Sequence, residues 1–111
     1  MNPSALSFLC ALGELPDGAS RGFDHHGNKL FGVRQGGNIY VYRNVCPHAA
    51  IPLEWHEHKF LDDSGTLIQC ANHGALFAIH TGQCVAGPCL GRNLQPVAHQ
   101  IINNEVWVAL P

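Results

Sequence analysis

Two short blocks in the middle of the chain each pair a thiol with an imidazole. The first is Cys46-Pro47-His48, and the second is Cys70-Ala71-Asn72-His73-Gly74. Each block offers one soft sulfur and one borderline nitrogen, so the four side chains suit zinc or an iron-sulfur cluster and not Mg²⁺ or Ca²⁺. Structural zinc sites usually group Cys with Cys and His with His. The mixed blocks therefore favour an iron-sulfur cluster, while a four-ligand zinc site stays open as an alternative.

The order of these motifs resembles that of the Rieske ferredoxin family. In a Rieske centre, two thiolates bind one iron of a [2Fe-2S] cluster and two imidazoles bind the other, so one Cys and one His per block let each block contact both irons. The resemblance covers most of the chain and rests on Cys46-x-His48, Cys70-x-x-His73-Gly74, Phe77, Thr81-Gly82 and Gly87-Pro88. It implies that one Rieske [2Fe-2S] cluster is the cofactor, that its metal ligands are Cys46, His48, Cys70 and His73, and that no residue is catalytic.

The resemblance also implies what surrounds the cluster. Gly87 and Pro88 should cover it as a third wall, and the outer nitrogens of the two ligand histidines should reach solvent. Residues 49–52 and 75–76 are apolar and are expected to form an uncharged rim suited to weak, transient docking.

Four positions differ from the high-potential branch of the family, and the two that lack a hydroxyl indicate a low reduction potential. That branch braces its ligand loops with a disulfide, at positions that are Ile51 and Asn72 here, and it donates hydrogen bonds to sulfur from a Ser and a Tyr, at positions that are Ala75 and Phe77 here. The resemblance therefore implies a protein reduced by a nicotinamide-fed reductase, and not one that oxidises a quinol.

Length and composition exclude several functions. A chain of 111 residues should form one domain, residues 1–111, with no room for the mononuclear iron domain of a terminal oxygenase. Six Lys and Arg, spread singly in a chain of net charge −2, form no basic stripe, so neither nucleic acid nor a membrane is an expected partner. Five cysteines are an odd number, and no basic residue precedes the apolar run 5–12, so we expect no secretory signal and a reducing, cytoplasmic location.

Hydrophobic periodicity predicts an all-β fold. Apolar residues alternate or cluster in fours to sixes, and Gly and Pro interrupt the chain about every ten residues. The expected architecture is a small antiparallel sandwich or barrel-like body with a cluster-binding lobe inserted over about residues 44–89. Expected strands are residues 5–12, buried on both faces, a short strand at 20–23, hairpins at 29–43 and 94–110, a hairpin between the ligand blocks with a turn at 62–65, and a short hairpin at 76–84.

Other Cys and His residues are not expected to bind a metal. His25 and His26 should lie in a solvated turn, and His56 and His58 on a polar strand edge, although their spacing invites comparison with a two-His, one-carboxylate iron site. Cys10 should be a small buried hydrophobe. Cys84 and Cys89 are close enough for a disulfide, but two reduced thiols are the favoured prediction in a reducing cell.

The sequence thus predicts an electron carrier between a reductase and a terminal oxygenase or another oxidoreductase, and not an enzyme in itself. Two alternatives stay open. One is a permanent small subunit of a larger reductase, like the nitrite reductase small subunit, and the other is a zinc-stabilised interaction module. The oligomeric state is not predicted.

Overall fold

The structure is a computed structural model that describes residues 6–47, 51–54, 56–71 and 74–110. Its elements form three antiparallel sheets of three strands each, with strand orders β1-β9-β8, β2-β3-β4 and β5-β6-β7. The elements are β1 (Ser7–Ala11), the 3-10 helix η1 (Leu12–Glu14), β2 (Ser20–His25), β3 (Asn28–Gln35), β4 (Asn38–Arg43), β5 (Leu67–Gln69), β6 (Leu76–Ala78), β7 (Cys84–Ala86), β8 (Ala98–Ile102) and β9 (Glu105–Ala109). The predicted all-β fold is confirmed.

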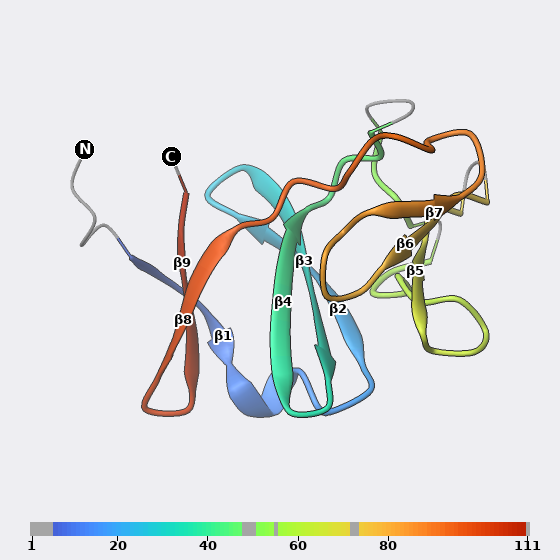
Figure 1. Cartoon of the computed structure of the whole chain (residues 1–111). Helices are drawn as coiled ribbons and strands as arrows, with labels where there is room; N and C mark the ends of the chain where they lie inside the picture. The colour runs from blue at the N-terminus through green and yellow to red at the C-terminus, as the bar shows by residue number, and fades with distance from the viewer. Residues whose placement is uncertain (1–5, 48–50, 55, 72–73, 111) are drawn as a thin grey trace.

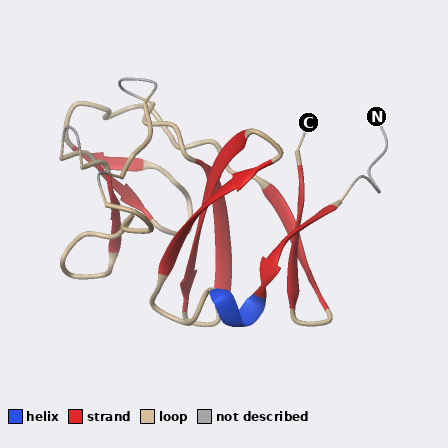
Figure 2. Ribbon diagram, turned by 180° about the vertical axis from the view of Figure 1, so that it is seen from behind, coloured by secondary structure: helices blue, strands red, loops and turns tan. Residues whose placement is uncertain are grey.

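The first two sheets form the body, and the third belongs to a separate lobe. Figure 1 shows β5, β6 and β7 on the side of the body away from β1 and β9, where both termini lie. Figure 2 shows the same three groups of strands from behind, with η1 as the short helical turn. The lobe is therefore an excursion of the chain between β4 and β8.

The hairpin of β3 and β4 is the central element of the body. Two glycines, Gly36 and Gly37, make its two-residue turn with φ of 61° and 82°, a conformation that side chains disfavour and that matches the twist of the paired strands. The predicted hairpin over residues 29–43 is confirmed. Its second strand ends at Arg43, three residues before Cys46, so this hairpin delivers the first ligand block.

The β3–β4 hairpin is covered on both faces. Side chains alternate between the faces of a strand. Leu30 and Val41 pack into one buried cluster with residues of β1 and β9, whereas Phe31, Val33 and Tyr42 pack into a second cluster with residues of the lobe. The hairpin is thus a wall shared by two cores, one inside the body and one between body and lobe.

Three contacts fix the lobe on that wall. The Tyr42 hydroxyl donates a hydrogen bond to the Ile79 carbonyl at 2.6 Å, and the rings of Phe31 and Phe60 stack with centroids 4.4 Å apart. Gly82 packs against the Tyr42 ring so closely that a Cβ would lie 2.7 Å from it. The second core therefore depends on aromatic side chains from both parts of the molecule.

Two local predictions are wrong. Strand β1 is not buried on both faces, because it pairs with β9 in a sheet whose outer face is open, and Phe8 is 45% exposed. His25 is buried at the end of β2, where its Nε2 and the Ser7 Oγ share a hydrogen bond of 2.7 Å. By contrast, the hairpin predicted between the ligand blocks forms about its turn at 62–65, where Leu61 bridges Ile68 and the Asp62 N–H donates to the Leu67 carbonyl.

The remaining strand predictions are confirmed with small shifts of boundary. The predicted strand at 20–23 extends to His25, the hairpin at 76–84 is β6 with β7, and the hairpin at 94–110 is β8 with β9. Cys10 is buried as predicted, and burial, with a smaller contribution from the nearby Glu14 carboxylate, raises the pKa of its thiol to about 11.

Candidate metal centre

The two ligand blocks lie on loops that are closed in the same way. The Cys46 N–H donates to the Ile51 carbonyl at 2.7 Å, and the Cys70 N–H donates to the Ala75 carbonyl at 2.8 Å. In both loops the bond spans five residues and encloses the position of the predicted His ligand. The two Cys/His motifs do not reveal this closure, which the described ends of the two loops share.

Both ligand cysteines lie in the core shared by body and lobe. Cys46 and Cys70 are fully buried and belong to the same cluster, together with Ala75 and Phe77. His48 and His73, the other two predicted ligands, lie outside the described residues, as do Ala49 and Ala50 of the predicted rim. The structure therefore brings the two sulfur ligands into one core, and the imidazole ligands stay a prediction.

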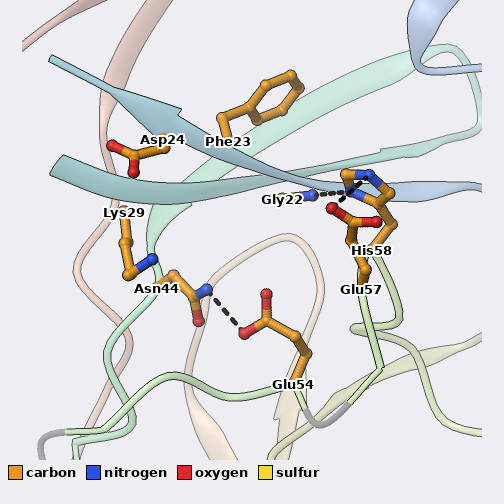
Figure 3. A pocket seen from close by; sticks show the side chains of 8 residues that line it. All are labelled: Gly22, Phe23, Asp24, Lys29, Asn44, Glu54, Glu57 and His58. Carbon is orange, nitrogen blue, oxygen red and sulfur yellow. Dashed lines mark hydrogen bonds and ion pairs between the residues drawn. The ribbon is translucent and has the colours of Figure 1, made fainter. Parts of the chain in front are cut away.

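The first ligand loop is fixed by a buried asparagine. Asn44 is 4% exposed, its Oδ1 accepts a hydrogen bond of 2.9 Å from the Leu53 N–H, and its Nδ2 donates to Glu54 Oε1 at 2.9 Å. Figure 3 shows the Asn44 and Glu54 side chains meeting in a hollow beside β2 and β3. Because the oxygen and the nitrogen of the side-chain amide both have hydrogen-bond partners, burial of this side chain stabilises one loop conformation. Sequence reasoning missed Asn44, and its position between a strand and a ligand block was the signal available.

The segment between the ligand loops is held against β2 by His58. The Gly22 N–H donates to His58 Nδ1 at 3.0 Å (Figure 3), and the Ser20 hydroxyl donates to the His58 carbonyl at 2.8 Å. His58 has φ of 66°, so it sits in a turn and not on a strand edge as predicted. With its Nδ1 engaged by the backbone, His58 acts as a structural anchor, whereas His56 is exposed as predicted.

A third segment packs directly on the second ligand loop. Gly87 has φ of 95°, and a Cβ at this position would lie 2.8 Å from the Ala75 Cα. Only glycine allows both the backbone conformation and this approach. Ala75 is accordingly buried, so its prediction as part of an exposed rim is wrong, while Ile51 and Pro52 of the rim are exposed.

The prediction that Cys84 and Cys89 are reduced is also wrong. The structure joins them in a disulfide, with Cα atoms 5.9 Å apart, within the range of ordinary bridges. The pairing arises because the chain reverses at Gly87 directly after β7, which returns Cys89 to the start of that strand. The bridge closes a small loop that contains Gly87 and Pro88.

Arginine 92 connects this third segment to the first ligand loop. Its Nη1 donates to the Pro47 carbonyl at 3.0 Å, and Pro47 lies between Cys46 and His48 in sequence. The Arg92 backbone is itself fixed, because its N–H donates to the Cys89 carbonyl and its carbonyl accepts from the Cys84 N–H. The guanidinium thus sits beside the first ligand block on a backbone that the disulfide holds.

The donor chemistry fits a [2Fe-2S] cluster better than a hard cation. Two thiol sulfurs are fully buried in one core, and the apolar neighbours Ala75 and Phe77 offer no oxygen ligand. The loops that carry the sulfurs have equivalent closures, which suits a cofactor with two metal positions. When bound, such a cluster accepts and releases one electron at a time.

Comparison with known proteins decides the family. The Rieske [2Fe-2S] domain family matches residues 6–103. This chain belongs to the Rieske [2Fe-2S] domain family. It therefore carries a [2Fe-2S] cluster, and the resemblance found in the sequence is confirmed.

Relatives and solved structures of this Rieske chain include oxygenase ferredoxins. It is 33% identical over 85 residues to the ferredoxin component of an alkene monooxygenase system from Xanthobacter autotrophicus, covering 74% of this chain and 66% of that protein. It is 27% identical over 84 residues to the ferredoxin component of biphenyl 2,3-dioxygenase from Rhodococcus jostii, covering 76% and 74%. The matched part thus spans just under two thirds of the first relative's length.

The fold matches a solved ferredoxin over nearly its whole length. The ferredoxin of carbazole 1,9a-dioxygenase from Nocardioides aromaticivorans superposes with a TM-score of 0.77 at 26% identity, covering 96% of this chain and 98% of that one. Among the described residues of this Rieske chain, no helix is long and apolar enough to cross a membrane.

Proposed function

We propose that this Rieske protein is a ferredoxin that carries single electrons from a reductase to a terminal oxygenase or another oxidoreductase. The observation that carries the proposal is the pair of equivalent loops, each closed by a Cys N–H bond to the residue five positions on, with both thiols in one core. The relatives support it, because their names describe ferredoxin components of a monooxygenase system and of a dioxygenase. We assign the chain no catalytic role.

In this proposal, Cys46 and Cys70 hold one iron and His48 and His73 hold the other. The two sulfurs share one buried site, which supports their assignment to one iron. Each imidazole lies within three residues of a thiolate in sequence, so each loop reaches both irons. The whole chain, residues 1–111, forms one domain, with the cluster-binding lobe at about residues 44–89.

We also propose a cytoplasmic location, where a nicotinamide-fed reductase and an oxygenase would both be present. Because the structure contains the Cys84–Cys89 disulfide, a lack of disulfides no longer supports this location. The proposal now rests on the partner systems of the relatives, and fractionation of the native cells tests it.

Metal analysis and spectroscopy test the cluster ligands. We expect about two irons and two acid-labile sulfides per chain after anaerobic purification. Exchange of His48 or His73 for Cys should permit a cluster of lower potential, because a thiolate returns negative charge to the iron. A protein with one zinc and no iron, or a potential that rises on both exchanges, would contradict the assignment.

Purification from the native source tests whether the carrier is free. A free ferredoxin should elute at the mass of its own chain or of a small oligomer of it. Elution with a large reductase chain that survives high salt would instead indicate a permanent subunit.

A further inference from the structure

The loop of residues 87–92 is the most prominent apolar point next to the candidate metal centre. Leu90 is 65% exposed, more than any other large hydrophobic residue among those described, and Pro88 beside it is exposed as well. Fully exposed leucines in isolation need no explanation. This one directly follows Cys89, which the disulfide ties to Cys84, and comes three residues after Gly87, which packs against Ala75, so the chain that leads to it is fixed.

Arginine 92 is the single formal charge in a long stretch of the sequence. Residues 65–104 contain no Asp, Glu or Lys, and Arg92 is their only Arg. Its side chain is exposed, and the Pro47 carbonyl accepts one of its five N–H donors. A carboxylate from another molecule could therefore bind the same guanidinium without breaking that contact.

The loop itself carries a charge opposite in sign to the net charge of the chain. The chain carries −2, yet its acidic residues lie at positions 14–63 and 105, outside the segment that supplies this loop. Charges steer association through the local field of the docking face and not through the net charge alone. An acidic partner is therefore attracted to this loop even though the whole molecule is acidic.

We propose that the loop of residues 87–92 is the docking point for the redox partner, and that the partner meets it with an apolar hollow for Leu90 and a carboxylate for Arg92. This inference rests on the proposed function and specifies the chemistry of the partner's surface. The Arg92 contact with Pro47 sets the docked partner beside the first ligand block, within one residue of Cys46 and of His48. Docking at this loop would bring the partner's redox centre closer to the cluster than docking on the body of the molecule would.

Stopped-flow oxidation of the reduced holoprotein tests the proposal with two protein probes. Plastocyanin is an acidic acceptor and cytochrome c is a basic one. The variants are Arg92→Gln, Arg92→Lys and Leu90→Ser. Controls are Arg34→Gln, a half-buried arginine at the turn end of the β3–β4 hairpin, and Ile101→Ser, a 46% exposed residue of β8.

The expected results differ between the two probes. Arg92→Gln should slow oxidation by plastocyanin about threefold or more at low ionic strength and should flatten its salt dependence, since charge steering is strongest when screening is weak. Oxidation by cytochrome c should be unchanged or faster. Arg92→Lys should restore the plastocyanin rate. Leu90→Ser should slow plastocyanin about fivefold at every ionic strength, as expected for an apolar anchor, and both controls should behave as wild type.

Two results would overturn the docking proposal. One is a plastocyanin rate that responds to Arg34→Gln and Ile101→Ser as strongly as to the loop variants. The other is a slower rate in Arg92→Gln together with an altered midpoint potential and an altered electron paramagnetic resonance spectrum, none of which Arg92→Lys restores. Arg92 would then act on the ligand loop and not on the partner. Failure of the proposed function is a separate outcome, since wild type would then show no two-iron spectrum and no reversible one-electron reduction.

Discussion

Removing the Cys84–Cys89 disulfide should destabilise the lobe without displacing the cluster. The double variant Cys84→Ala/Cys89→Ala removes the bridge and introduces no buried hydroxyl. Neither residue belongs to the predicted ligand set, and β7 is joined to the second ligand loop through its partner strand β6 and through Gly87, which follows β7. The visible spectrum of the cluster should therefore persist in the variant.

The stabilisation that the disulfide provides follows from the number of residues in the loop that it closes. The bridge joins residues five apart in sequence and so encloses six residues. The chain-entropy relation for a loop of this size gives about 2 kcal/mol of stabilisation at 25 °C. Both cysteines are buried, so the lost sulfur atoms add about 1 kcal/mol of packing. For a chain of this length, the bridge term alone corresponds to a fall of roughly 8 °C in Tm.

Thermal melting with and without a reductant separates these two contributions. Dithiothreitol should lower the Tm of wild type by the bridge term and leave the double variant unchanged. Cys10→Ala is the matched control, because Cys10 is buried in the body core and lies outside the bridge, so it reports the packing loss alone. Alkylation after unfolding and iron removal should label three thiols in wild type and five after reduction.

Three results would contradict this account of the bridge. Labelling of five thiols in wild type without a reductant would show that the bridge does not form in the protein. Alternatively, breaking the bridge could leave the Tm within 1 °C of the Cys10→Ala control, or could abolish the cluster spectrum while far-ultraviolet circular dichroism remains native. The last result would show that the disulfide positions the ligand loops directly.

Three further predictions concern the contacts around the lobe. Gly87→Ala should lower the free energy of unfolding by about 2 to 4 kcal/mol, because the φ of 95° disfavours a side chain and the new methyl would meet the Ala75 backbone. Denaturant unfolding measures this loss, with Gly91→Ala as the control, because nothing lies within 4 Å of the Cβ added there. Tyr42→Phe should lower the free energy of unfolding by about 1 to 3 kcal/mol, because the Ile79 carbonyl loses its donor. Burial raises the pKa of Tyr42 to about 12, so the stability that this group provides should be complete below pH 10 and should fall as the pH rises through 12. Tyr42→Phe should not show this loss at high pH. Phe77→Tyr should raise the midpoint potential by at most roughly 60 to 130 mV if its hydroxyl donates to a sulfur of the site; a potential that falls would show that this position does not set the poise.

Local signals in the sequence were sufficient for most of the fold. Paired glycines at 36–37 and alternating apolar residues predicted the central hairpin, because turn geometry and strand periodicity are properties of neighbouring residues. The two Cys/His blocks likewise predicted the cofactor, since the choice of metal depends on donor type more than on fold.

The wrong predictions all depend on contacts between distant segments. The Cys84–Cys89 bridge forms because Gly87 reverses the chain against Ala75, which lies on another loop. The sequence predicts His25 in a turn, but the residue ends β2 and is buried with its Nε2 against Ser7 of a separate strand, and its pKa is lowered by that burial and by the neighbouring His26. The spacing of the two cysteines allows the bridge, but the approach of Gly87 to Ala75 and of Ser7 to His25 is not encoded by neighbouring residues.

The environment of the two thiols explains why a low potential is expected of this Rieske protein. Cys46 and Cys70 are buried in an apolar core, where an added negative charge is poorly solvated. Their own backbone N–H groups donate to the Ile51 and Ala75 carbonyls, so these amides do not stabilise charge on sulfur, and the Ala75 and Phe77 side chains offer no hydroxyl. Arg92 opposes this trend, but it is exposed and screened by solvent, so its effect on the potential is smaller than its effect on a partner that covers it. The buried shell therefore sets the poise of the site, and the exposed loop selects what can exchange electrons with it.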